Sequence, residues 1–190
     1  MEAFAETISV LGVPVFMHSL GEDLSPSVVV ARWRHSDAEI DIGASGTVRV
    51  AINLQDGHHA RHHIGSAALQ AIPKVGSVSV LPADERVKVA IQGEADILAI
   101  FLRETFLETA VDGQFACLAL FNSHDSELRA AAFQLLIAAA RGEPDDSLLL
   151  ETGIHRIANG LVDRSNQRSC ARASGGLARA ARARSLVATI

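Results

Sequence analysis

Hydrophobic and polar residues alternate over much of the first hundred positions, in short runs that Gly, Pro, Asp and Asn interrupt. A period of two places every second side chain on the same face of a β-strand. Residues 27–35, 46–55, 76–83 and 86–91 show this pattern, and the run at 96–102 is apolar on both faces, which is typical of a central strand. The pattern predicts at least five antiparallel strands in a sandwich or small barrel.

Two of these strands have faces of different character. The strand at 27–35 places Trp33 and His35 on one face and its arginines on the other. The strand at 46–55 has valines on its apolar face, with polar residues opposite. If these faces line a barrel cavity, they offer one large aromatic ring and several hydrogen-bonding groups to an organic ligand. For the polar pair the strand's character favours a position facing water, and for the tryptophan the alternative is core packing. The candidate effector-binding residues are Trp33, His35, Arg49 and Asn53.

Past residue 103 the apolar pattern changes to the period of a helix. Residues 103–111 predict a short helix. Ser123 or Asp125 can cap the N-terminus of a longer one, which runs to Arg141 and ends at a glycine and a proline. A third helix begins near residues 145–147 with apolar residues at spacings of four, three and four, as in helices packed on helices. We predict that this stripe is a dimerisation contact made by Leu150, Ile154, Ile157 and Leu161.

Two glycines, Gly153 and Gly160, lie on a stripe beside these apolar residues. A glycine in a helix interior costs about 1 kcal/mol relative to alanine. Two of them on one stripe therefore indicate a close approach of the helix backbone, either to the barrel or to a second copy of the helix.

Composition excludes several classes of protein. With 48% hydrophobic and 21% charged residues, the chain can bury a core. No apolar run approaches the length of about 18 residues that spans a bilayer, and acidic rather than basic residues precede the first apolar ones. We therefore expect a cytoplasmic protein without a membrane partner. Cys117 and Cys170 form no CxxC motif, so neither a disulfide framework nor a zinc site is predicted.

Three common motifs of enzymes and nucleotide-binding proteins are missing from the sequence. It contains no GxSxG, P-loop or GxGxxG pattern, and no two carboxylates have the spacing of an acid–base pair. We therefore expect that the chain is not an enzyme, and we predict neither catalytic residues nor a cofactor.

Four histidines fall within six positions, at His58, His59, His62 and His63, a density that suits Zn, Ni or Cu. In a strand, His59 and His63 share one face and the other two share the opposite face. A cupin-type metal site would have an HxH pair followed by a carboxylate, and neither is present here. We predict no metal and a solvated hairpin whose histidines titrate near pH 6.5. The alternative is a stand-alone cupin-like metal-binding protein or enzyme that uses the His58–His63 cluster.

Charge is distributed unevenly along the chain. Asp163 is the last acidic residue and six arginines follow it, whereas residues 1–163 carry 11 of the 17 basic and all 22 acidic side chains. The basic, alanine-rich segment that begins at Gly175-Gly176-Leu177 is typical of the first helix of a nucleic-acid-binding module. A solvated basic tail is the alternative that charge alone leaves open.

Three segments together resemble the AraC/XylS family of bacterial transcription regulators. They are the turn and strand Ile72-Pro-Lys-Val-Gly-Ser-Val-Ser-Val-Leu-Pro-Ala83, the strand Gly93-Glu-Ala-Asp-Ile-Leu-Ala-Ile-Phe-Leu102, and the terminal Gly175-Gly-Leu-Ala-Arg to Ile190. The resemblance implies an α+β fold, a cupin-like antiparallel β-barrel followed by a C-terminal helical layer. It divides the chain into a barrel sensor (1–102), a helical dimerisation layer (103–165), and a linker with the start of a truncated DNA-binding domain (166–190).

This resemblance also implies a function. The chain would be the effector-sensing and dimerisation domain of a DNA-binding regulator, with a small-molecule effector and a second copy of itself as partners. DNA would be bound only through a C-terminal domain that this chain lacks. The residues Asp84-Glu-Arg-Val87 follow the turn where family members often have His or an aromatic, so the family's pocket residues do not carry over. A ligand-free scaffold that pairs with another protein is a third interpretation.

Overall fold

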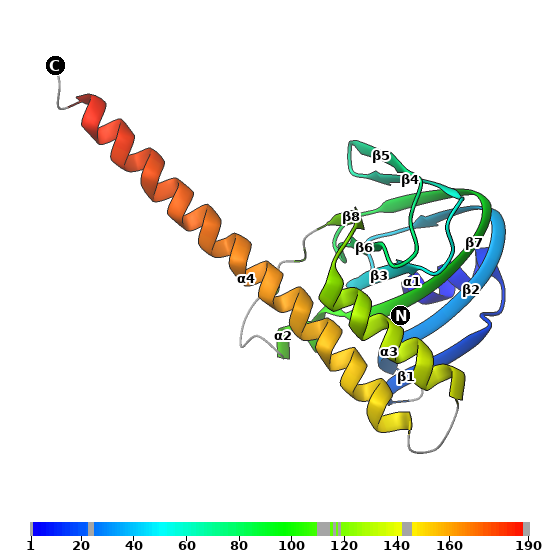
Figure 1. Ribbon diagram of the computed structural model, residues 1–190. Coiled ribbons are helices and arrows are strands. Elements are labelled where there is room, and N and C mark those ends of the chain that lie inside the picture. Colours follow the sequence, from blue (N-terminus) through cyan, green and yellow to red (C-terminus); the bar gives the residue numbers. More distant parts are fainter. Residues whose placement is uncertain are drawn as a thin grey trace.

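The computed structural model describes all residues except 1, 23–24, 110–114, 116, 118, 142–145 and 188–190, and it describes no side chains at 22, 25, 67 and 167–187. A strongly curved sheet carries α3 and α4 on one face, and α4 extends beyond the sheet (Figure 1). In chain order the elements are α1 (Glu2–Leu11), β1 (Phe16–Glu22), β2 (Ser25–Ile42), β3 (Thr47–Asn53), β4 (His59–Ile64), β5 (Ala67–Ala71), β6 (Val78–Leu81), β7 (Val87–Arg103), α2 (Glu104–Thr109), β8 (Leu120–Ser123), α3 (Ser126–Arg141) and α4 (Asp146–Val187).

The strands form one eight-stranded sheet in the order β1-β2-β7-β3-β6-β8, with β4 paired to both β7 and β5. All of these pairs are antiparallel. Since β7 pairs with β2, β3 and β4, it is the central strand that the apolar run at 96–102 predicted. The antiparallel sheet followed by helices confirms the predicted α+β class. Among the described strands the hydrogen-bonded path ends at β1 and β8, so the curved sheet does not close into a ring.

Two expected strand ends are bends inside longer strands. The strands predicted at 86–91 and 96–102 are one strand, β7, because Gly93 adopts a φ of +91° that turns the backbone without ending the pairing. The facing strand β2 shifts register between Ser36 and Ala38, where Asp37 has a φ of 44°. The Gly93 N–H donates a hydrogen bond to Asp37 Oδ1 (2.8 Å). The two bends therefore support each other and curve the sheet.

One face of the sheet packs against the helices. The predicted apolar face of β3, represented by Val48, Val50 and Ile52, lies in this core together with buried residues of α3 and α4. The stripe predicted to mediate dimerisation lies in the same core. Because these side chains pack within the chain, they are not available to a second copy, which corrects their assignment as a dimerisation contact. The exposed fractions are 7% for Leu150, 0% for Ile154, 0% for Ile157 and 5% for Leu161.

Asp125 joins α3 to α4 at the beginning of α3. Its Oδ1 accepts hydrogen bonds from the N–H groups of Glu127 (3.1 Å) and Leu128 (2.9 Å), so Asp125 rather than Ser123 is the N-cap. The same carboxylate forms an ion pair with Arg164 of α4. Helix α4 continues past residue 166 to Val187, and the predicted division into domains stays a prediction. None of the described helices is long and apolar enough to cross a membrane.

The two helix glycines mark the place where α4 approaches α3. A Cβ added at Gly153 would lie 2.6 Å from Cδ2 and 2.8 Å from Cγ of Leu135, whereas one added at Gly160 would lie 3.2 Å from Cδ2 of Leu128. The close approach expected from the glycine pattern is therefore present. Its partner is α3 of the same chain, instead of the barrel or a second copy.

We expect Gly153→Ala to lower the free energy of unfolding by about 1 kcal/mol. Overpacking against the fully buried Leu135 costs roughly 1–3 kcal/mol, which outweighs the roughly 1 kcal/mol that alanine gains in helix propensity. Urea unfolding followed by circular dichroism measures the change. Gly160→Ala is the matched control and should be near neutral. Equal stabilisation by both substitutions would contradict the close packing at Gly153.

Candidate functional site

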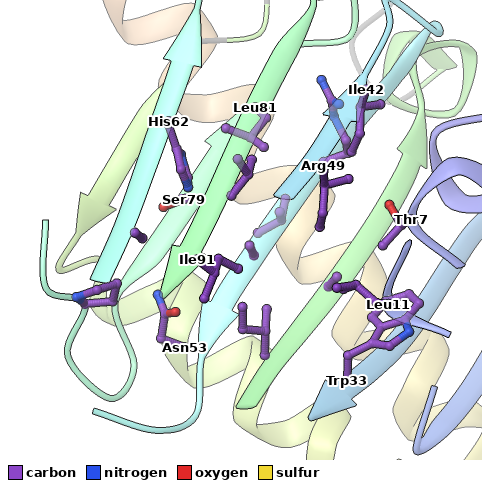
Figure 2. A pocket seen from close by; sticks show the side chains of 18 of the residues that line it. Thr7, Leu11, Trp33, Ile42, Arg49, Asn53, His62, Ser79, Leu81 and Ile91 are labelled. Carbon is purple, nitrogen blue, oxygen red and sulfur yellow. The ribbon is translucent and has the colours of Figure 1, made fainter. Parts of the chain in front are cut away.

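A cavity of about 90 Å³ lies on the sheet face opposite α3 and α4. Residues of β2, β3, β4, β6 and β7 line it, and α1 contributes Thr7 and Leu11 at one side (Figure 2). By the same measure of volume one water needs roughly 10–15 Å³. The cavity therefore has room for several waters or for one small organic molecule.

All four residues predicted as effector contacts line this cavity. Alternation along β2 and β3 turns Trp33, His35, Arg49 and Asn53 toward it, while the valines of β3 point to the helices. Arg49 and Asn53 are only 4% and 6% exposed, so the expectation that they face water was wrong. Their polar face is turned into the cavity. Binding of an effector by these residues stays a prediction.

Aromatic rings form the apolar wall near α1. The ring centroids of Trp33, Phe4 and Phe101 are 5.3–6.2 Å apart, in tilted and edge-on arrangements. The Trp33 Nε1–H donates to the carbonyl of Gly12, just after α1 (2.9 Å). Because its only polar group is used in this way, Trp33 offers a ligand its ring and no hydrogen bond. The same bond fixes the end of α1 against this side of the cavity.

The structure separates the four clustered histidines into two pairs. His59 and His63 are exposed, as predicted for a solvated hairpin. For His58 and His62 that prediction was wrong, because both are buried and line the cavity, and the His62 ring packs edge-on against Phe121 with centroids 4.4 Å apart. The cluster is therefore not one site. Among the described residues, no group of three His, Cys, Asp or Glu side chains is placed to hold a metal ion.

The histidines of the cavity are uncharged near neutral pH. Burial lowers the pKa of His62 to about 4, and the positive charge of Arg49 lowers it as well. Burial also lowers the pKa of His35 and of His58. Both ring nitrogens of His35, and Nδ1 of His58 and of His62, are buried without a hydrogen-bond partner among the described residues. Each neutral ring has one donor and one acceptor, so the cavity contains unmatched groups of both kinds.

Arg49 is the charged residue of the cavity. Its Nη2 donates to the carbonyl of Pro82 (2.9 Å), whereas Nε and Nη1 are buried without a partner. Burial lowers its pKa to about 10, so the guanidinium is still charged at neutral pH. Among the described residues no carboxylate lies within 4.0 Å of it. A buried charge without a partner is costly and points to a ligand or a functional role.

Other polar groups beside the cavity are held by the protein itself. Asn53 Nδ2 donates to the hydroxyl of Ser77 (3.0 Å) and to its carbonyl (3.3 Å), which fixes the amide. The hydroxyl of Ser79 accepts the N–H of Asn122 (3.1 Å), and the hydroxyl of Thr7 donates to the carbonyl of Ala3 (2.7 Å). Sequence reasoning missed His58, His62 and the contribution of α1. The shared face of the two histidines was visible in the sequence, but their burial was not.

The known proteins to which this chain is similar are solved structures of low sequence identity. No protein-family model matches the sequence, and a search of curated proteins found no match. The cupin domain of Cnp3 from Schizosaccharomyces pombe is similar, with a TM-score of 0.38 and 12% identity over 51% of this chain and 70% of that chain. The AraC-like transcriptional activator CuxR has a TM-score of 0.46 and 7% identity over 77% of this chain and 55% of its own. A predicted oxalate decarboxylase from Thermotoga maritima has a TM-score of 0.36 and 14% identity over 46% of this chain and 78% of that chain.

These three structures have TM-scores below 0.5. They include a transcriptional activator and a predicted decarboxylase, so their names do not point to one function. Activity, ligand and partners have to be inferred from the cavity.

We expect the free energy of unfolding to fall as the pH drops through the range in which His62 is protonated in the unfolded state but not in the folded state. An unfolded histidine binds a proton near pH 6.5 and folded His62 only near pH 4, so acid favours the unfolded chain between about pH 6.5 and 4. The contribution of His62 is complete above that range and lost below it. It amounts to roughly 3 kcal/mol.

The measurement compares urea unfolding of the wild type and of His62→Gln at several pH values. The variant should lose less stability than the wild type on acidification from pH 7 to pH 4. His63→Gln, which replaces an exposed histidine on the same strand, is the control and should keep the wild-type pH dependence. Identical pH dependence in His62→Gln and the wild type would contradict a buried neutral His62.

Proposed function

We propose that this chain is the effector-sensing domain of an AraC-type transcription regulator and binds a small organic molecule in the cavity. The observation that carries the proposal is the lining, an apolar and aromatic wall with a few buried polar groups that have no partner among the described residues. Ligand sites are typically apolar clefts in which a small number of polar groups fix the orientation of the ligand. The family resemblance supplies the regulatory role, and the cavity supplies the place where an effector acts.

A binding role suits the chemistry of the cavity better than a catalytic one. Its two hydroxyl groups, on Thr7 and Ser79, both make hydrogen bonds to the backbone. Arg49, the charged side chain among its described lining residues, is a group for recognition rather than proton transfer at neutral pH. The paired arrangement of histidines also leaves no common centre for the metal-dependent alternative. We therefore propose a sensor that does not transform its ligand.

The sheet provides a short route from the cavity to the helices. Arg49 and Asn53 of β3 face the cavity, while Val48, Val50 and Ile52 of the same strand pack in the core with α3 and α4. A ligand that shifts β3 by a fraction of an ångström must disturb the packing on the opposite face, because packed cores do not deform continuously. Preferential binding to one arrangement of sheet and helices then shifts the population toward it.

The proposed regulator acts as a dimer, and the exposed part of the helical layer is the surface available for a second copy. Three exposed apolar residues lie near the end of α3 and the beginning of α4. We propose them as candidate dimer contacts in place of the buried stripe of Leu150, Ile154, Ile157 and Leu161. Large apolar side chains exposed to water are typical of such contacts. They are Ile137, Leu148 and Leu149, with exposed fractions of 54%, 68% and 51%.

We expect effector binding to change the fluorescence of Trp33, the single tryptophan of the chain. A ligand in the cavity meets its ring directly, and it also raises the melting temperature because it binds only the folded state. A library of small organic molecules screened by both readouts tests this expectation. Ala99→Leu, which narrows the cavity but keeps Trp33, is the control and should weaken the response. A library in which no compound affects either readout would contradict an effector cavity.

We expect Leu148→Glu with Leu149→Glu to produce a monomer of unchanged secondary structure, because a charge at an apolar contact opposes association but is tolerated at an exposed helix position. Light scattering and circular dichroism measure the two properties. Ile157→Asp is the contrasting variant and should unfold the chain, since it buries a charge in the core. A wild type that is monomeric at all concentrations, or a bound effector that leaves the dimerisation constant unchanged, would contradict the coupling of sensing to dimerisation.

A further inference from the structure

The charge of Arg49 has no counter-charge inside the cavity. Of the ten buried side-chain atoms without a hydrogen-bond partner among the described residues, six belong to residues that line the cavity. Two of these six, Nε and Nη1 of Arg49, belong to a charged group. Among the described residues that line the cavity there is no aspartate or glutamate. Removing a charge from water without a partner costs several kcal/mol, which a bound anion would offset.

The same sheet satisfies a buried charge on its other face. Asp96 of β7 is buried and accepts hydrogen bonds from Arg32 (2.6 and 2.8 Å) and from Arg34 (2.8 Å) on β2. Here one carboxylate has two guanidinium partners. The lack of a partner at Arg49 is therefore a property of the cavity and not of the fold in general.

We propose that the cavity binds a small organic carboxylate and that Arg49 holds its carboxylate group. This inference rests on the proposed function, because it names the chemical class of the effector. A carboxylate carries the single negative charge that one arginine balances, and the guanidinium fork matches its geometry. A phosphate dianion would leave a second charge buried, since the three histidines facing the cavity are neutral. The apolar wall formed by Trp33 and Phe101 suits a hydrocarbon body, preferably a ring.

Two groups outside the cavity lining also act on Arg49. Burial raises the pKa of the Cys117 thiol to about 12, with Asp84 and Glu104 adding to the effect, so this group is neutral. Glu6 of α1 attracts Arg49 electrostatically but forms no ion pair with it within 4.0 Å, and its Oε2 is buried without a partner. A movement of Glu6 onto Arg49 is therefore the rival explanation, in which the arginine is a structural partner of α1.

The experiment uses pairs of a carboxylate and its neutral amide that have the same shape. Suitable pairs are phenylacetate with phenylacetamide, cyclohexanecarboxylate with its amide, and isovalerate with isovaleramide. Binding is followed by Trp33 fluorescence and by calorimetry. We expect at least one acid to bind the wild type about tenfold or more tightly than its amide, as a charge-assisted hydrogen bond provides. The preference for the acid over its amide should disappear in Arg49→Met, to a ratio of about one, and should be only partly lost in Arg49→Lys.

Arg61→Met is the matched control, because it removes the same charge from an exposed position on β4. It should keep the preference for the acid. In the absence of ligand, Arg49→Met should melt no lower than the wild type, since it replaces an unpaired buried charge with an apolar side chain of similar length. Glu6→Gln should tighten acid binding, because the carboxylate of Glu6 repels the anion. These stability measurements separate loss of binding from loss of the fold.

Four other outcomes would overturn the inference, and each one identifies the part of it that is wrong. Amides that bind as tightly as the acids would leave the proposed sensor intact and exclude an anionic effector. No binding by any pair, together with a silent library screen, would overturn the sensor as well. Tighter binding of inorganic phosphate than of any organic acid would exclude a carboxylate. Lower melting temperatures for both Arg49→Met and Glu6→Gln would show that Glu6 is the partner of Arg49.

Discussion

The long antiparallel pairing of β2 with β7 is the interaction on which the rest of the structure depends. It runs from Val28 opposite Leu102 to Ile42 opposite Val87, through the paired bends at Asp37 and Gly93. The bends add a sharp local change of direction to the ordinary twist of the two strands, and so curve the sheet round the cavity. Every other strand except β8 is attached to this pair directly or through one neighbour. The curvature fixed by these two strands thus determines where the cavity lies.

A sheet with side chains on both faces serves two purposes at once. On one face its valines, leucines and isoleucines pack with the helices, and on the other the same strands line the cavity. Helix α1 completes the second layer, because its end is fixed to Trp33 and its apolar residues pack around Ala31 and Phe101. Any change of the cavity wall therefore reaches the helical layer through the thickness of one strand. This arrangement is the physical basis for the proposed coupling between a ligand in the cavity and the helices.

The sequence allowed the central strands, their faces and the helical layer to be predicted, because periodicity is a local property. The strand faces grouped Trp33 with His35 and Arg49 with Asn53, but they did not show that the polar face of β3 turns into the cavity instead of toward water. Helix α1 and the edge strands β1 and β8 escaped detection, since short segments at edges and ends depend on what they pack against. The stripe on α4 was recognised as a helix contact, but periodicity alone does not say whether the partner helix belongs to the same chain. Burial of His58 and His62 likewise depends on β4 pairing with β7, a contact between distant segments.

The distribution of unsatisfied polar groups separates the site from the scaffold. Where the chain needs stability it pairs its charges: Asp125 caps α3 and binds Arg164, and Asp96 holds two arginines. At the cavity it leaves two guanidinium nitrogens of Arg49 and several imidazole nitrogens without partners among the described residues, at a cost in folding free energy. Residues that lower the stability of the fold are expected to be concentrated at the functional site. Six of the ten unsatisfied buried atoms among the described residues belong to residues of this one cavity, and the missing counter-charge of Arg49 indicates the charge of the ligand that should fill it.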